Sequence, residues 1–269
     1  MALEAERGGS LFLLVQGGRL RRRLTQALDL MPPRTRPKKT NLSTAHHARL
    51  RAKWRRWLTP MSSDLSDLFR RQEIFWQLQE VAKETPSILK NGAFFSWMCN
   101  NYIDAFAIRL RAYVDQSKGS HSLWRLLYEA IENPGAINIT THANLYRNTP
   151  FGVAFGESCF RNCVGQKASV LSGRAIRIDM KKLEDFSDRL RRFVNKRVAH
   201  RNRLGAIRRL PTFNEIDNTL SVIDRLFCKY NFLLSASGMD SCRATAQYDW
   251  RDVLWDPWIP AGSPLRPKV

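Results

Sequence analysis

The chain has 269 residues, of which 43% are apolar, so it can bury a full hydrophobic core in one or two domains. Its formal net charge of +20 favours a polyanionic partner, most often nucleic acid. The five cysteines are odd in number and scattered, which argues against a disulfide framework and predicts a reducing, cytoplasmic compartment. No stretch approaches the roughly 18 apolar residues of a membrane span, so no membrane partner is expected.

The first 60 residues carry more than half of the positive charge. They hold 14 Lys or Arg against 3 Asp or Glu, a net of +11, and the remainder holds 30 against 21, a net of +9. This basic composition predicts a disordered tail over 1–60, with partial helix between about 44 and 58. The run MSSDLSDLF, from Met61, also resembles a natural chain start, which would place 1–60 outside the natural protein.

Three helices are predicted before residue 135, each followed by proline or glycine. They cover 63–83, 93–115 and 122–132, and each has one apolar face. The outer face of the second helix carries the polar residues Asp104, Arg111 and Asp115.

The segment 136–177 contains several glycines and no clear periodicity, so it is predicted to be an irregular insertion. A helix over 178–203 follows, with its start at Asp179. Its apolar stripe is continued by two polar residues, an arginine and a histidine. The positions that lie 4, 7, 11 and 14 residues after Phe186 share one helical face, and they are Leu190, Phe193, Arg197 and His200.

Arg197 and His200 conflict with the apolar pattern that they continue. Burying a charge costs several kcal/mol unless it is paired, so these side chains need a partner, a ligand or a wet groove. Alternatively, the stripe leaves the core after Val194 and both side chains reach solvent near a helix C-terminus, where cations suit the helix dipole. The pattern leaves both interpretations open.

A capping box at Thr212–Glu215 starts another helix. Its apolar positions from Phe213 to Leu234 follow a 3-4 spacing, so it is predicted to pack lengthwise against another helix, within the chain or in a homodimer. Three tryptophans, Trp250, Trp255 and Trp258, are expected to lie back over the bundle.

Together these elements predict an all-α bundle of four to six helices over 61–260, flanked by the tail 1–60 and a C-terminal tail 261–269. Cys159 and Cys163 do not have the spacing of a zinc site, and no phosphate-binding loop or dicarboxylate motif is present. We therefore expect no metal and no cofactor.

His200 lies within a strongly basic run. Cations around an imidazole disfavour its charged form, so His200 could act as a neutral general base near pH 7. Cleavage of RNA needs a base for the ribose 2′-OH, a cation for the charge developing on phosphorus, and an acid for the leaving oxygen. One such helix supplies the base and the cation, and two helices across a two-fold axis would supply all three groups without metal.

The array IDAFAIRLRAYVDQSKGSHSLWRLLYEAIENP, RRFVNKRVAHRN, LPTFNEIDNTLSVIDRLFCKYNFLL and QYDWRDVLWDPW resembles the HEPN superfamily, in particular its abortive-infection AbiU-like branch of bacterial proteins. The resemblance spans roughly 61–260. It implies a helical bundle, often dimeric. In catalytic members it implies a metal-independent endoribonuclease of phage-defence or toxin–antitoxin systems, in which an antitoxin would be a partner.

Catalytic members of that superfamily carry an Arg, then four to six residues, then a His. The corresponding positions before His200 are Phe193, Val194 and Asn195, none of which is basic. Asn195 occupies a polar position that the motif often uses, and Arg197, one turn before His200, would replace the missing cation. The resemblance therefore implies the catalytic residues His200, Arg197 and Asn195, the RNA-binding residues Arg192, Lys196, Arg201 and Arg203, and the supporting residues Asp104, Arg109 and Arg111.

A second interpretation keeps the fold but not the chemistry. In it the chain is a non-catalytic dimerisation or RNA-binding module, and Arg197 and His200 hold helices together.

Overall fold

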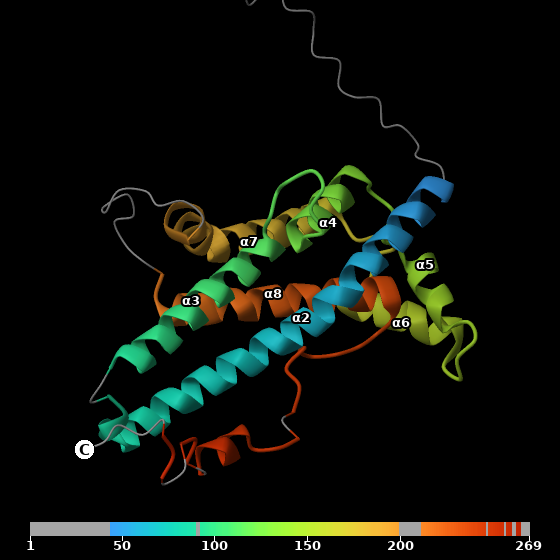
Figure 1. Cartoon of the computed structure of the whole chain (residues 1–269). Helices are drawn as coiled ribbons and strands as arrows, with labels where there is room; N and C mark the ends of the chain where they lie inside the picture. The colour runs from blue at the N-terminus through green and yellow to red at the C-terminus, as the bar shows by residue number, and fades with distance from the viewer. Residues whose placement is uncertain are drawn as a thin grey trace, which may run out of the picture. The chain divides into compact units, whose positions relative to one another are not determined.

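The computed structural model describes residues 44–89, 92–198, 211–245, 247–255, 257–259 and 262–264, with the backbone alone for residues 197 and 198. The chain divides into two units, 1–42 and 43–269, and all described residues belong to the second. This unit is all-α, as predicted, and within it the described residues form only an isolated β-bridge between Asn138 and Val170 (Figure 1). No helix in the described ranges combines the length and apolar character that crossing a membrane requires.

The described residues form seven α-helices and four short helical segments. The α-helices are α2 (Thr44–Glu84), α3 (Ala93–Tyr113), α4 (Leu123–Glu132), α5 (Ile139–Ala143), α6 (Gly152–Val164), α7 (Gly173–Phe193) and α8 (Phe213–Ser235). The short segments are the 3-10 helices η1 (Pro86–Leu89), η2 (Asn144–Tyr146) and η4 (Trp250–Leu254) and the π-helix η3 (Val194–Val198).

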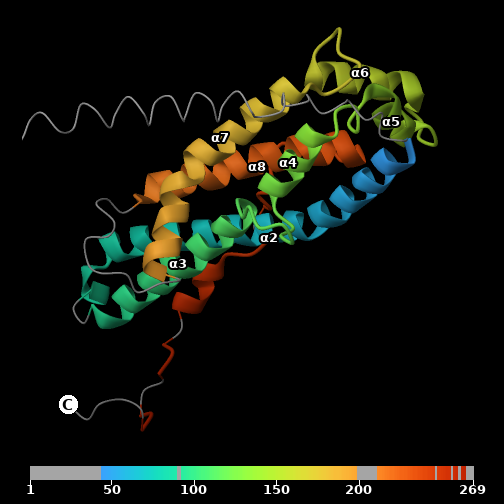
Figure 2. The same ribbon diagram turned by 90° about the horizontal axis from the view of Figure 1, so that it is seen from above.

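Helix α8 lies at the centre of the bundle, with α2 and α7 packed along it (Figures 1 and 2). It begins with the predicted capping box between Thr212 and Glu215. The predicted seam is buried within this unit except at its first member, Phe213, which is 38% exposed and lies against Phe75 and Trp76 of α2. The packing partners of the buried members are helices of the same chain. The buried members Ile216, Leu220, Ile223, Phe227, Tyr230 and Leu234 are each at most 4% exposed.

Helix α2 is longer and more continuous than the sequence predicted. A disordered tail to residue 60 was expected, with partial helix between about 44 and 58 and a separate helix from Ser63, but α2 runs without a break from Thr44 through Pro60. Apolar residues at helical spacing explain the difference, because they pack into the core from the first turns onward. They are Trp54, Trp57, Leu58, Met61 and Leu65, each at most 7% exposed.

Helices α3 and α4 match their predicted bounds closely. Helix α4 starts at Ser122, whose hydroxyl accepts a hydrogen bond from the amide of Arg125. The predicted irregular insertion, in contrast, contains two helices, α5 and α6, which pack against each other. Gly156 of α6 permits this contact, because a Cβ there would lie 2.7 Å from the Cα of Ala143.

The C-terminal tryptophans behave differently from one another. The indole N–H of Trp250 donates a hydrogen bond to Gln77 on α2, so this part of the segment lies back on the bundle as predicted. Trp255 and Trp258 are 83% and 65% exposed, so the prediction was wrong for them. The Asp-Pro sequence before Trp258 disfavours a helical continuation that would turn these rings inward.

Candidate functional site

Helix α7 carries the predicted functional stretch, but it starts six residues before Asp179. The hydroxyl of Ser172 caps the helix by accepting a hydrogen bond from the amide of Ala175. Asp179 instead contacts α8, where its carboxylate accepts hydrogen bonds from Lys229 at 2.7 Å and Tyr230 at 2.9 Å. These two contacts fix the first half of α7 on the central helix.

The apolar stripe of α7 holds for most of its length. Leu183, Leu190, Phe193 and Val194 are buried, each at most 7% exposed. Phe186 was placed on the same stripe, but this residue is 44% exposed. Its backbone carbonyl accepts a hydrogen bond from Thr219 of α8. The inward position on that turn is taken by the small side chain of Ser187, which is 2% exposed. The helix is thus rotated slightly from the orientation that the pattern predicted.

The stretch after Phe193 is a π-helix, η3, rather than a continuation of the α-helix. A π-helical turn adds a residue to the α-helical repeat, so side chains beyond it no longer follow the earlier spacing. The α-helical spacing that placed Arg197 and His200 on the same face as Phe186 therefore does not apply beyond Val194. Only the backbone of Arg197 is described, and His200, Arg201 and Arg203 lie outside the described residues.

Arg111 and Asn195 meet where α3 contacts η3. The Nε of Arg111 donates a hydrogen bond to the Oδ1 of Asn195 at 2.7 Å. Both side chains are half-buried, and the partner of the guanidinium is a neutral amide. Among the described residues no carboxylate lies within salt-bridge distance of Arg111, although its charge helps to lower the pKa of Asp115, one turn later on the chain. The structure thus brings together one predicted catalytic residue and one predicted supporting residue.

The other predicted residues lie apart from this junction or face solvent. Arg192 is exposed and pairs with Asp188, one turn earlier, at 2.6 Å. Lys196 is exposed on η3, and Asp104 is exposed on α3. Arg109 contacts α2 instead of η3, which differs from its predicted supporting role. Its guanidinium pairs with Asp64 at 3.1 Å and with Asp67.

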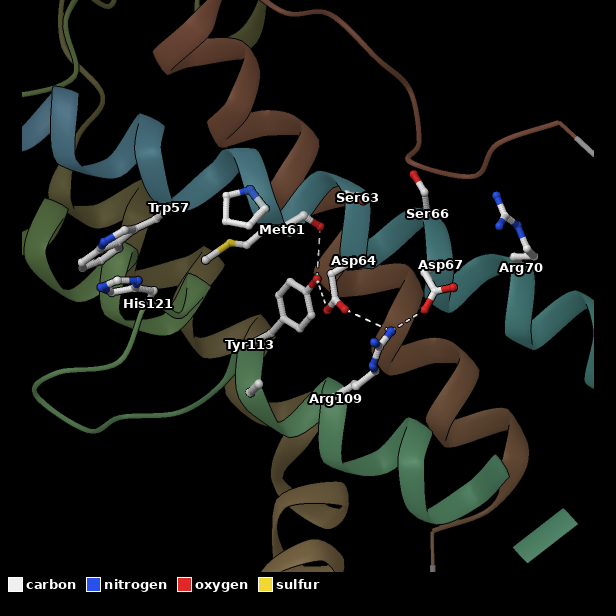
Figure 3. Close-up of a pocket in the computed structure, with 12 residues that line it drawn as sticks. Trp57, Met61, Ser63, Asp64, Ser66, Asp67, Arg70, Arg109, Tyr113 and His121 are labelled. Atoms are coloured by element: carbon white, nitrogen blue, oxygen red, sulfur yellow. Dashed lines mark hydrogen bonds and ion pairs between the residues drawn. The ribbon is translucent and has the colours of Figure 1, made fainter. Parts of the chain in front are cut away.

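A cavity of about 730 Å³ lies between α2, α3 and the loop that follows α3 (Figure 3). Arg109 sits between Asp64 and Asp67 on one side of it, and Tyr113 donates a hydrogen bond to Asp64 at 2.9 Å. At the other end, the ring of His121 stacks on Trp57, with ring centroids 5.0 Å apart.

The polar groups of this cavity satisfy one another. Burial and the neighbouring Asp64 carboxylate raise the pKa of Tyr113 far above its ordinary value, so its hydroxyl remains a donor. Burial would raise the pKa of Asp67, but hydrogen bonds and charge from Arg71 and Arg109 lower it overall. Both carboxylates pair with Arg109. These contacts hold α2 against α3. They therefore indicate a structural role for the group rather than a catalytic acid or base.

Sequence reasoning missed this cavity. Tyr113 is buried, at 3% exposed, and a buried tyrosine hydroxyl needs a partner. That requirement was the available signal for a polar group opposite it. The partner Asp64 lies 49 residues earlier in the chain, and no local pattern links the two positions.

Comparison of the chain with protein-family models, with curated proteins and with solved structures found no match.

Proposed function

We propose that this chain is a HEPN-like RNA-directed protein, which binds RNA along the outer side of α7 and η3 and cleaves it there without a metal ion. The observation that carries the proposal is the contact between Arg111 of α3 and Asn195 of η3. This contact holds the Arg111 guanidinium, which forms no direct salt bridge with a described residue, against the segment that leads to His200. Arg109 is left out of this site because the carboxylates of α2 hold it.

The charge of α7 and η3 supports an RNA-binding surface. Residues 173–198 hold nine Lys or Arg and four Asp or Glu, a net of +5. Lysine and arginine bind phosphates largely through charge, so such a surface attracts RNA whatever its sequence. The basic side chains exposed here are Arg174, Arg177, Lys181, Lys182, Arg192 and Lys196.

The proposed chemistry assigns one task to each group. His200 removes the proton of a ribose 2′-OH, and the resulting oxygen attacks the adjacent phosphorus. Arg111, aided by Arg197, stabilises the negative charge that develops on the phosphate oxygens. Asn195 positions Arg111 through the hydrogen bond between them. The products would be a 2′,3′-cyclic phosphate and a 5′-hydroxyl, and the role would be that of a phage-defence or toxin–antitoxin nuclease.

A homodimer remains part of the proposal, because a second copy would supply the acid for the leaving oxygen. Such a dimer must use a surface other than the α8 seam, since that seam is buried within the chain. Light scattering at micromolar concentration measures the assembly state directly.

RNA binding is tested with two matched arginine substitutions. Arg192 and Arg161 are both exposed and both pair with an acidic residue four positions earlier, Asp188 and Glu157. We expect Arg192→Ala to weaken the binding of a labelled single-stranded RNA and to reduce its salt slope by about 1. Arg161→Ala, on α6, removes the same charge elsewhere and should leave the slope unchanged. Equal effects of both substitutions would show that α7 is not the binding surface.

Cleavage is tested separately, in buffer that contains a chelator. The parent protein should yield RNA fragments with cyclic phosphate ends, and His200→Ala should abolish them while RNA affinity stays within about two-fold. Arg111→Ala should lower the rate at saturating RNA, and Arg111→Lys should restore part of it because the positive charge returns. Binding without any cleavage would instead establish the non-catalytic RNA-binding module.

A further inference from the structure

Three buried side chains with metal-binding atoms meet where the chain turns back after α8. Asp224 and Cys228 lie one turn apart on that helix, and Cys242 comes from the segment behind it. A carboxylate oxygen and the two sulfurs all lie within 4.8 Å of one another. Ligand atoms around one tetrahedral zinc ion lie about 3.5–4 Å apart, given bonds of about 2.0–2.3 Å. The three groups therefore need only small movements to bind a single ion.

Asp224 is a buried carboxylate that lacks a cation. Asp224 is 4% exposed. Its carboxylate accepts hydrogen bonds from the backbone N–H of Cys242 at 2.9 Å and from the thiol of Cys228 at 3.8 Å. Among the described residues, no salt bridge reaches it. A buried ionised carboxylate is costly unless it is paired or binds a metal, so a cation at this position would remove an imbalance.

A fourth donor lies beside the three. The thioether sulfur of Met239 is 3.7 Å from the sulfur of Cys242, at the more exposed edge of the group. Two thiols and a thioether are soft ligands, which favour zinc or monovalent copper over magnesium or calcium. With the carboxylate of Asp224 they complete a set of four, the number that a closed structural zinc site uses.

We propose that Asp224, Cys228 and Cys242, with Met239 at the edge, form a structural site for a zinc-type cation. Binding displaces one proton from each of the two thiols, and both protons leave to solvent. The site is independent of Cys159 and Cys163, which lie on α6.

The site would fasten the segment after α8 to the bundle. Ser66 of α2 already donates a hydrogen bond to the carbonyl of Cys242 at 2.8 Å. The next residue, Arg243, donates to Gln72 at 3.0 Å and lies over the ring of Phe69. On the other side, the backbone N–H of Cys242 bonds to Asp224 of α8, and a cation bound by Cys242, Asp224 and Cys228 would strengthen this link. Its role would therefore be to hold the C-terminal segment in place, apart from the RNA surface on α7.

The experiment starts from full-length protein that has been stripped of metal under reducing conditions. Zinc is then titrated, and binding is followed by calorimetry in two buffers of different ionisation enthalpy. We expect one ion per chain, proton release and a rise in melting temperature. Replacing zinc with cobalt should produce the thiolate-to-cobalt absorption and the visible bands of a tetrahedral site.

Substitutions decide which residues bind the ion. Cys228→Ser and Cys242→Ser should each weaken zinc binding by roughly 100-fold or more, beyond the loss that supporting residues cause. Asp224→Asn retains the acceptor for the Cys242 amide, so it should fold while losing affinity. As a control, the double substitution Cys159→Ser with Cys163→Ser removes two cysteines from α6, outside the proposed site. It should bind zinc as the parent does.

Two results would overturn the proposal. One is a zinc affinity that is unchanged in Asp224→Asn and in both single cysteine variants, which would place any bound ion elsewhere. The other is a Cys228–Cys242 disulfide that forms readily in air, with no zinc bound by the reduced protein. Mass spectrometry after thiol alkylation separates the disulfide from the metal-bound pair.

Discussion

The Nε of Arg111 lies 2.7 Å from the Oδ1 of Asn195, so a side chain of α3 is bonded to the π-helical segment that follows α7. π-Helical turns are rare in proteins. Those that occur are often found at functional sites. Here the turn gives Asn195 a position from which it reaches α3. The contact therefore links an unusual backbone to the candidate RNA site.

This pair should be coupled in stability. A double-mutant cycle with Arg111→Ala and Asn195→Ala is expected to give a coupling free energy of about 1 kcal/mol, as for a hydrogen bond between a charged and a neutral group that is partly screened by solvent. The measurement is urea unfolding of the four proteins. A coupling indistinguishable from zero would mean that the two side chains do not interact in solution.

The first turns of α2 should be essential to the core. Trp54 is fully buried, and its indole N–H donates a hydrogen bond to Glu129 at 3.0 Å. Trp54→Ala is expected to lower the free energy of unfolding by about 3–5 kcal/mol. Trp255→Ala removes the same side chain from a site that is 83% exposed, so its effect should stay within about 0.5 kcal/mol.

The same burial predicts that a protein truncated to begin at Met61 is unstable. Such a chain lacks Trp54, Trp57 and Leu58, all of which are buried in the core. We expect it to be far less stable than the full chain, with an early and broad thermal transition. A truncated protein with the melting temperature of the parent would show that residues 44–60 do not support the bundle.

Local signals in the sequence predicted α3, α4 and α8 well, because an apolar period specifies each of them and a side-chain cap starts α4 and α8. Partial helix between about 44 and 58 was predicted, but its continuation through residue 60 was missed. The reason is that its apolar positions, among them Leu50 and Trp54, are embedded in a basic run whose composition suggested a tail. The π-turn at Val194–Val198 coincides with the contact between Asn195 and Arg111 of α3, and no local sequence pattern predicts either of them. The cavity beside Tyr113 was likewise invisible, since its walls come from two helices.

The contact between α5 and α6 should depend on the absence of a side chain at Gly156. A Cβ there would lie 2.6 Å from the ring of Tyr146, closer than such atoms normally approach. Gly156→Ala is therefore expected to destabilise the protein by about 1–3 kcal/mol through overpacking. At Gly119 an added methyl group would have no other atom within 4 Å, so Gly119→Ala serves as the control and should not destabilise the protein. Equal melting temperatures for the two variants would contradict the close packing.

Stability should fall as the pH drops below about 6.5, because of His142. This residue is 1% exposed, among Tyr146, Phe160 and Phe232, and its Nδ1 lies 3.1 Å from the carbonyl oxygen of Leu233. Burial lowers the pKa of His142, and the hydrogen bond with Leu233 only partly opposes this. Between the lowered and the ordinary pKa, the unfolded chain therefore binds a proton at His142 that the folded chain does not bind. The contribution of His142 to the free energy of unfolding is complete above the ordinary pKa and declines as the pH falls toward the lowered pKa.

The comparison of the parent with His142→Gln isolates this effect, because glutamine can donate to the same carbonyl but does not titrate in this range. Urea unfolding at a series of pH values from about 7 to 5 should show a steeper loss of stability in the parent than in the variant. The difference should vanish above about pH 7, where the imidazole is neutral in both the folded and the unfolded state. Identical slopes in the two proteins would mean that a different group causes the loss. A steeper slope in His142→Gln would contradict the sign of the linkage itself.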